Sequence, residues 1–446
     1  MKKFILWSII LLFSADAPAQ FMIGVAKKNI TPAGPIWLSG YAARRKPSEG
    51  VLQDIWAKAL VIEGKKNEKL LILTTDLIGL THEMSQYIFD AMKSEYGFER
   101  SQVLLNSSHT HSGPVIWPGL AVMYNLADSD LMKLVSYNQK LKKDLVDVAG
   151  EAIGKMEKGR IMSGHGTADF AINRRQQTEK GVSIGLNPSG PVDHDVPVVK
   201  FISDDGSIIA ILFGYACHNT VLDGYEICGD YAGFAQSEVE SNFPGTIAMF
   251  MQGCGADQNP NPRRSIDNAK VHGRALAEAV TKTVNGELAT VEHHFRTAFQ
   301  TATLDFEGFD PGEYIRQFSE NNLYKKSRAG FLLQAYERGY DLGSVTYPVQ
   351  AVRFGRDLAI VALAGEVVVD YSLKTKQRYP KENLFVSGYC SEVPCYIPSL
   401  RVLKEGGYEP EESMIYYGLP GPLKDNVEEK ISETIDWVMR KTGGRR

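Results

Sequence analysis

Short apolar runs rich in β-branched residues recur along the chain, and they limit its fold more than any other feature of the sequence. Runs of this kind are typical of buried strands. Segments with a helical spacing of apolar residues separate them, including one that ends near Gly154 and one that follows Pro422. Strands that alternate with helices predict an α/β fold with mixed sheets and flanking helices. The predicted strands are residues 59–62, 70–74, 102–105, 198–202, 208–213, 247–251, 358–363 and 384–386.

Two segments depart from this alternation. Residues 306–347 are rich in aromatic and charged side chains, and their spacing predicts a helical insertion rather than strands. The insertion either borders a site or serves as an aromatic-rich packing cap. Residues 181–191 are predicted to form an exposed loop.

The N-terminus has the pattern of a secretory signal peptide. Lys2 and Lys3 precede an apolar run, and Ala17-Pro18-Ala19 supplies the small residues that a signal peptidase requires. We therefore expect residues 1–19 to be removed, and residues 20–446 to form a single domain that is periplasmic or secreted. The apolar run is too short to cross a bilayer, and no later segment predicts a transmembrane helix.

Charge and cysteine content limit the partners and the covalent cross-links. The formal net charge is -4, so the chain has no excess of basic residues that could bind the phosphate backbone of a nucleic acid. We therefore do not expect a nucleic acid partner. The odd number of cysteines argues against a full disulfide framework. Cys390 and Cys395 are the closest pair, and both a disulfide and two free thiols remain open for them. The other cysteines are expected to be buried free thiols.

Polar residues of catalytic type follow directly after several predicted strands. His109 and His111 follow the strand at 102–105, His218 follows 208–213, and Glu366 follows 358–363. Ligands of α/β sheets bind beyond the carboxyl ends of the strands, where such loops converge. These side chains are therefore expected to share one crevice.

The two histidines of the His-x-His motif are suited to a metal. Side chains two residues apart on extended backbone point the same way, so His109 and His111 can face one ion or one substrate. Imidazole and carboxylate groups are ligands that zinc accepts readily, and a catalytic zinc keeps one position open for water. His218 alone fits a hydrogen-bonded core histidine. Together with Glu366, these histidines predict a metal site.

The segment Ser108-His109-Thr110-His111-Ser112-Gly113-Pro114 resembles the histidine motif of the neutral, non-lysosomal ceramidases. The similarity extends over essentially the whole catalytic domain of that family and implies a neutral-ceramidase-like catalytic domain. It continues through residues 24–26, 30–32, 40–42, 75–76, 172–174, 229–233, 359–366 and 388–399.

Carried over by position, the resemblance implies one zinc ion per chain, held by His109, His218, Glu366 and Tyr396. It also implies that His111 and Arg174 contact the scissile carbonyl or the developing oxyanion.

Each of these implied roles has a structural alternative. Tyr396 also fits a half-buried structural tyrosine. Arg174 also fits a surface ion-pair partner, and its neighbour Arg175 could take its place.

Two departures from the family pattern limit the implied activity. Ceramidases carry Gly-Asp-x-Ser-Pro-Asn in the loop with an active-site serine, whereas residues 256–261 here place Asn259 at that position. An amide cannot act as a nucleophile. Family ceramidases are also longer and end in an immunoglobulin-like domain, which we do not expect here. An amidohydrolase related to the ceramidases is therefore favoured over a conventional ceramidase.

These inferences predict a zinc-dependent hydrolase that cleaves an N-acyl amide bond with metal-activated water. Asp257 is the candidate for accepting the proton of the water, with His111 as its rival; Asp257 also fits a helix cap. Asn259, Asn219 and Gln258 are candidates for orienting a small-molecule or lipid substrate. Two alternatives remain open. One is a zinc hydrolase that acts on a glycan-derived amide, ester or glycosidic bond, and the other is a ligand-binding family member without catalysis.

Overall fold

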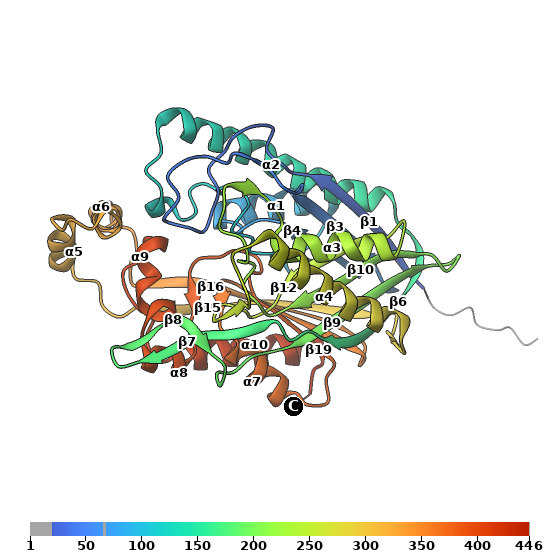
Figure 1. Cartoon of the computed structure of the whole chain (residues 1–446). Helices are drawn as coiled ribbons and strands as arrows, with labels where there is room; N and C mark the ends of the chain where they lie inside the picture. Colours follow the sequence, from blue (N-terminus) through green and yellow to red (C-terminus); the bar gives the residue numbers. More distant parts are fainter. Residues whose placement is uncertain (1–19, 66–67, 446) are drawn as a thin grey trace, which may run out of the picture.

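The computed structural model describes residues 20–65 and 68–445, so the predicted signal peptide lies outside the described residues. Two β-sheets pack face to face, and helices cover the outer face of each (Figure 1). The α/β class with mixed sheets and flanking helices is therefore confirmed. Within the described ranges, none of the helices has the length and apolarity needed to cross a membrane.

The larger sheet has nine strands, and its alternating side chains explain the layers. In one of its central strands, Leu60 and Ile62 point into the core between the two sheets, whereas Ala59 and Val61 pack against helices. The strand order is β12 (Ile247–Gln252), β10 (Ile208–Tyr215), β9 (Asp195–Ser203), β6 (Glu157–Thr167), β1 (Phe21–Asn29), β3 (Trp56–Glu63), β4 (Lys69–Thr75) and β5 (Val103–Ser107), with β14 (Ala289–Thr290) paired to β6. The β10–β12 and β4–β5 pairs are parallel, and the other pairs are antiparallel.

The smaller sheet has four strands and completes the central core. Its inner face contributes side chains such as Val352 and Ile360 to the same apolar cluster as Leu60. Its strands run in the order β15 (Phe295–Asp305), β16 (Ser344–Phe354), β17 (Leu358–Leu363) and β19 (Leu384–Ser387). The helices that flank the two sheets are α1 (His82–Tyr96), α2 (Asp128–Gly154), α3 (Asp230–Asn242), α4 (Ile266–Asn285), α7 (Asp370–Arg378), α8 (Leu400–Glu405) and α10 (Val427–Thr442).

Every predicted strand is present, but the predicted loop at 181–191 is wrong over most of its length. Residues Gly181–Asn187 form β8, which pairs with β7 (Ala171–Thr178) in a three-stranded sheet with β13 (Gln258–Pro260). No residue of β8 is buried. Val182, Ile184 and Leu186 do alternate with small residues as in a strand, but the glycines within the segment and the turn residues at 187–191 are typical of a loop.

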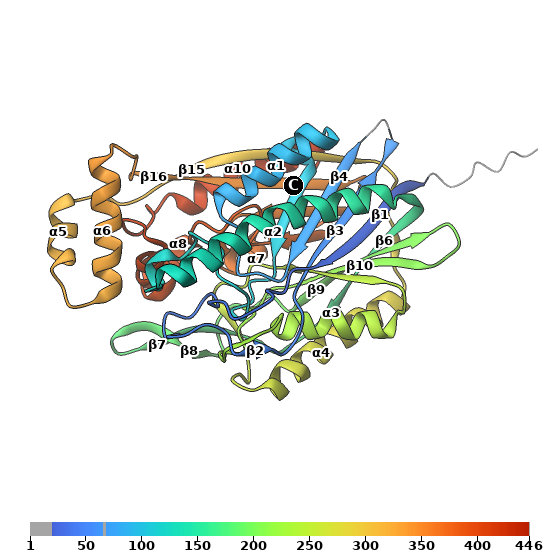
Figure 2. The same ribbon diagram turned by 90° about the horizontal axis from the view of Figure 1, so that it is seen from above.

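Two helices lie between β15 and β16 and project from one end of the molecule (Figures 1 and 2). They are α5 (Pro311–Phe318), which Asp310 caps, and α6 (Leu323–Glu337), which Asn322 caps. The short helix α9 (Met414–Tyr417) lies next to α6.

All five cysteines are buried and free, so the structure has thiols at Cys390 and Cys395 rather than a disulfide. Two short parallel pairs complete the fold: β2 (Gly50–Val51) with β11 (Glu226–Ile227), and β18 (Glu366–Val367) with β20 (Tyr396–Ile397).

Candidate active site at the carboxyl ends of the strands

Asn106 joins the ends of three strands and so places the loops that follow them. It is the fourth residue of β5, and its Oδ1 accepts a hydrogen bond from the backbone N–H of Gln252 at 2.9 Å. Its Nδ2 donates to the carbonyl of Gly388 at 2.8 Å. Gln252 ends β12, and Gly388 directly follows β19. The polar segments after β5, β12 and β19 therefore begin within hydrogen-bond distance of one side chain.

In both His109 and His218, a hydrogen bond at one ring nitrogen fixes the direction of the second nitrogen of the same ring. His109 Nδ1 lies 2.6 Å from the carbonyl oxygen of Ile78, and His218 Nδ1 lies 3.0 Å from that of Gly255. A carbonyl only accepts, so both Nδ1 atoms carry a hydrogen, and in a neutral ring Nε2 is left with a free lone pair. Burial, followed by the charge of Arg174, lowers the pKa of His218 to about 4 and keeps its ring neutral.

Glu366 places a carboxylate oxygen between these two nitrogens. Its Oε2 lies 3.1 Å from His109 Nε2 and 3.2 Å from His218 Nε2, and no hydrogen-bond donor reaches it. Three buried lone-pair donors that face each other repel unless a cation lies among them. The donor set therefore fits a metal ion.

Tyr396 and His111 extend this cluster. The Tyr396 hydroxyl lies 3.3 Å from His218 Nε2, and His111 Nε2 lies 3.1 Å from His109 Nε2. Candidate ligand atoms of the three histidines all lie within 4.8 Å of one another. The structure thus brings together the four residues predicted as ligands, with His111 beside them.

His111 is buried but has one ring nitrogen without a partner. Its Nδ1 makes no hydrogen bond, and burial, with the neighbouring His109 and His218, lowers its pKa well below the usual value. A Cβ at Gly40, whose φ is +89°, would overlap the ring. Gly40 is therefore required for this close approach.

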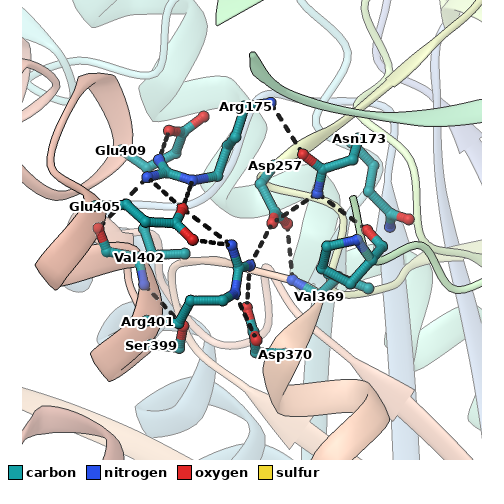
Figure 3. Close-up of polar contacts among 12 residues, drawn as sticks. Asn173, Arg175, Asp257, Val369, Asp370, Ser399, Arg401, Val402, Glu405 and Glu409 are labelled. Carbon is teal, nitrogen blue, oxygen red and sulfur yellow. Dashed lines mark hydrogen bonds and ion pairs between the residues drawn. The ribbon is translucent and has the colours of Figure 1, made fainter. Parts of the chain in front are cut away.

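Of the two adjacent arginines in β7, Arg174 reaches the cluster. Its Nη2 donates to the Tyr396 hydroxyl at 3.1 Å, and its Nη1 lies 3.5 Å from Asn259 Oδ1. Its Nε donates to Glu409 Oε1 at 2.8 Å. Arg175 instead lies between Glu409 and Glu405 (Figure 3). Glu409, in the π-helical turn Tyr408–Glu412, therefore holds both guanidinium groups.

Asp257 lies in a neighbouring network rather than in the histidine cluster. Its Oδ1 accepts from the backbone N–H of Val369 at 2.8 Å, and its Oδ2 lies 3.3 Å from Asn173 Nδ2 and 3.6 Å from Arg401 Nη2 (Figure 3). Burial raises its pKa to about 6. These contacts fix the loop that carries Asn259.

The side chains of Asn219 and Gln258 also form hydrogen bonds with the backbone. Asn219 Nδ2 donates to the carbonyl of Gly229 at 3.0 Å, and Gln258 Nε2 donates to that of Ala216. Gln258 Oε1 accepts from the backbone N–H of Asp193 at 2.9 Å. Both side chains therefore stabilise the loops around the cluster.

A pocket of about 290 Å³ opens beside the cluster. Five of the predicted residues line it: His111, Arg174, His218, Asn259 and Tyr396. Sequence reasoning missed several others, namely Tyr41, Ile184, Arg263, Arg264, Tyr408 and Tyr416. It also missed Tyr417, whose hydroxyl donates to Glu366 Oε1. The tyrosines at 408–417 are the one sequence signal that could have indicated this side of the pocket.

The chain is similar to members of one known protein family. Residues 21–290 match the family model described as neutral/alkaline non-lysosomal ceramidase, N-terminal. The chain is similar to the neutral ceramidase of Pseudomonas aeruginosa, with 26% identity over 55% of this chain and 38% of that protein. It is also similar to neutral ceramidase B of Dictyostelium discoideum, with 23% identity over 56% of this chain and 37% of that one.

The match to these curated relatives thus spans only about 37–38% of their length. The fold is similar over a longer range. The crystal structure of the neutral ceramidase from Pseudomonas aeruginosa superposes with a TM-score of 0.74 at 18% identity, covering 96% of this chain and 75% of that one.

Proposed function

The chain belongs to the neutral/alkaline non-lysosomal ceramidase family, and from this premise we propose that it is a metal-dependent hydrolase that cleaves an N-acyl amide bond. The observation that carries the proposal is the position of Glu366 Oε2, which has no donor and faces the Nε2 atoms of His109 and His218. The names of the relatives support an amide of the ceramide type as the substrate.

Zinc is the metal that we propose for this donor set. His109, His218, Glu366 and Tyr396 would hold it, because imidazole, carboxylate and phenolate are ligands suited to zinc. A zinc ion supplies a Lewis acid that makes water a nucleophile near neutral pH.

Arg174 is placed to stabilise negative charge on the substrate oxygen. Its guanidinium lines the pocket and is held by Glu409 on one side and Tyr396 on the other. Such a preorganised donor contributes about 3–4 kcal/mol in comparable sites. Asn259 lines the same wall and cannot act as a nucleophile, which supports direct attack by water.

His111 is the better candidate for holding the proton of the attacking water. Its Nε2 lies 3.1 Å from His109 Nε2, and its side chain lines the pocket. Asp257 already accepts from Val369 and Asn173 and does not line the pocket. We therefore assign proton transfer to the His111 imidazole, whose Nε2 faces the cluster, and a structural role to Asp257.

A second candidate substrate is an N-acylated sugar. Tyr41, Tyr408 and Tyr416 line the pocket together with three arginines. Tyrosine faces can pack against sugar rings, and arginines bind their polar substituents. This candidate keeps the metal site and the reaction and changes only the molecule that carries the amide.

The test combines metal analysis with a substrate panel. We expect the purified protein to retain about one zinc per chain by elemental analysis and to hydrolyse N-acyl sphingosine or an N-acetylated sugar. Glu366→Gln should lose both metal and turnover. Glu433→Gln, at an exposed position, is the matched control. Metal-free wild-type protein, together with wild-type behaviour of Glu366→Gln, would contradict the proposal.

We also propose that the protein is exported. The support is the signal-peptide pattern of residues 1–19, including the small residues Ala17-Pro18-Ala19. N-terminal sequencing of the protein from its native host should give a chain that begins at Gln20. A chain that retains Met1 and stays inside the cell would contradict export.

A further inference from the structure

The large apolar side chains that are exposed among the described residues are most numerous on the projection formed by α5 and α6. Six of them are between 47% and 76% exposed, and we call them the apolar tip: Ile315, Phe318, Leu323, Phe331, Tyr336 and Tyr340. Figures 1 and 2 show that the β7–β8 hairpin projects from the same end of the molecule. Ile184 and Leu186 of this hairpin are also exposed. Soluble monomers rarely gather so many apolar side chains in one exposed region.

The apolar tip lies outside the buried core of the projection, although the Tyr336 ring lies 5.4 Å from that of Phe309 at the edge of this core. The core consists of Tyr314, Ala329 and Leu332, with partly buried neighbours. Two side-chain hydrogen bonds help to attach the projection to the rest of the molecule: the Tyr324 hydroxyl donates to the carbonyl of Ala42 at 2.7 Å, and the Tyr314 hydroxyl donates to that of Pro420. The exposed side chains are therefore available to a partner.

The apolar tip is continuous with the candidate active site. Phe331 lines a second pocket of about 240 Å³, whose walls are mainly apolar and include Tyr417, the hydrogen-bond donor to Glu366. The Tyr324 ring lies 5.4 Å from that of Tyr416, which lines the pocket beside the histidines. A partner on the tip would therefore lie next to both pockets.

The charges of the projection argue against an ionic partner. Residues 310–340 contain five basic and four acidic side chains, and some pair within the segment, such as Lys325 with Glu320 at 3.3 Å. Binding there would gain little from electrostatic attraction and much from the burial of apolar and aromatic surface. Aromatic side chains with polar atoms are favoured at the boundary between water and lipid.

We propose that the apolar tip docks the protein onto a lipid surface, so that both pockets face the layer from which an amide lipid is taken. The inference rests on the proposed function for the identity of that lipid. The docking itself requires only the apolar tip.

The experiment is co-sedimentation of the full chain with vesicles of phosphatidylcholine that contain no amide lipid. We expect wild-type protein to bind, and binding to persist at about 0.5 M salt, because no net charge drives it. Ile315→Gln/Leu323→Gln/Tyr340→Gln should lower the partition coefficient by at least about tenfold. Ile266→Gln/Val271→Gln is the matched control, because both side chains are exposed on α4, away from the projection.

Each outcome bears on the proposal. Unchanged urea unfolding of the triple variant would show that loss of binding is not loss of fold. Equal binding of the triple variant and wild type, or no vesicle binding at all, would overturn the docking. A dimer in the absence of lipid, abolished by the same substitutions, would overturn it in favour of self-association. Vesicle binding without amidase activity would refute the proposed function and leave the docking intact.

Discussion

Glu366 and Tyr396 are direct partners in the parallel pair of β18 and β20. The backbone N–H of Glu366 donates to the carbonyl of Cys395 at 2.9 Å, which fixes the register of this short pair. A carboxylate and a phenol that come from separate segments are thus presented side by side to His218. The position of these two candidate ligands is set by backbone hydrogen bonds rather than by flexible loops.

Tyr417→Phe should weaken metal binding without removing a proposed ligand. The Tyr417 hydroxyl donates to Glu366 Oε1 and so leaves Oε2 facing the histidines. Loss of such an orienting hydrogen bond lowers metal affinity by about 10–100-fold. Competition with a chelator measures the change, and Tyr87→Phe, at an exposed position, is the control. Equal affinity in both variants would show that the hydroxyl does not orient Glu366.

Gly40→Ala should displace His111 and reduce turnover by about a hundredfold, since small displacements at a reacting centre have effects of that size. The added Cβ would overlap the His111 ring. Gly206→Ala is a close control, because Gly206 has a φ of +90° against +89° for Gly40 but no atom near its Cβ position. Both variants should lose about 1–2 kcal/mol of stability from the left-handed backbone, and only Gly40→Ala should lose activity.

The strands that could be predicted from the sequence are those buried on both faces. β10 and β17 are continuous apolar runs with almost every residue buried, and such runs stand out from their flanks. The short apolar alternation of β8 is obscured by its glycines and by the turn residues that follow it, and β6 has exposed residues along much of its length. For such strands the neighbouring chain, rather than the sequence pattern, decides the conformation.

The candidate site was predictable where a motif or a strand end marked it. His109 and His218 follow buried strands, and the structure places both at the centre of the cluster. Asp257 also follows a strand, but sequence position does not set the direction of its side chain, which points toward Val369. Glu409 and Tyr417 come from a segment that carries no strand signal. Their roles depend on packing between distant parts of the chain.

Stability should depend on pH through His165. Its ring lies 2.8 Å from Asp195 Oδ1 and 2.5 Å from Asn383 Oδ1. Partial burial lowers the pKa of His165, but Asp195 outweighs it, so the pKa is raised. The protonated ring therefore adds stability that is fully present below the unfolded pKa of about 6.5 and is lost as the pH rises through the folded value.

His165→Gln keeps a polar side chain but cannot take up this proton. Its unfolding midpoint should fall below that of the wild type at about pH 6, and the difference should shrink by about pH 9. Urea titrations of both proteins at the two pH values measure it. A difference that is the same at both would show that the charge of His165 does not contribute.

Glu409→Gln should be the most destabilising of these substitutions. Glu409 is buried and accepts from Arg174 at 2.8 Å and from Arg175, so its loss of charge leaves two buried guanidinium groups without their shared carboxylate. Removing one partner of a buried ion pair costs about 3–5 kcal/mol, which urea unfolding would show. Glu405→Gln is the matched control, because Glu405 also contacts Arg175 but is a quarter exposed, and such pairs contribute at most about 1 kcal/mol. Equal losses in both variants would mean that Glu409 has no special role in holding Arg174 against Tyr396.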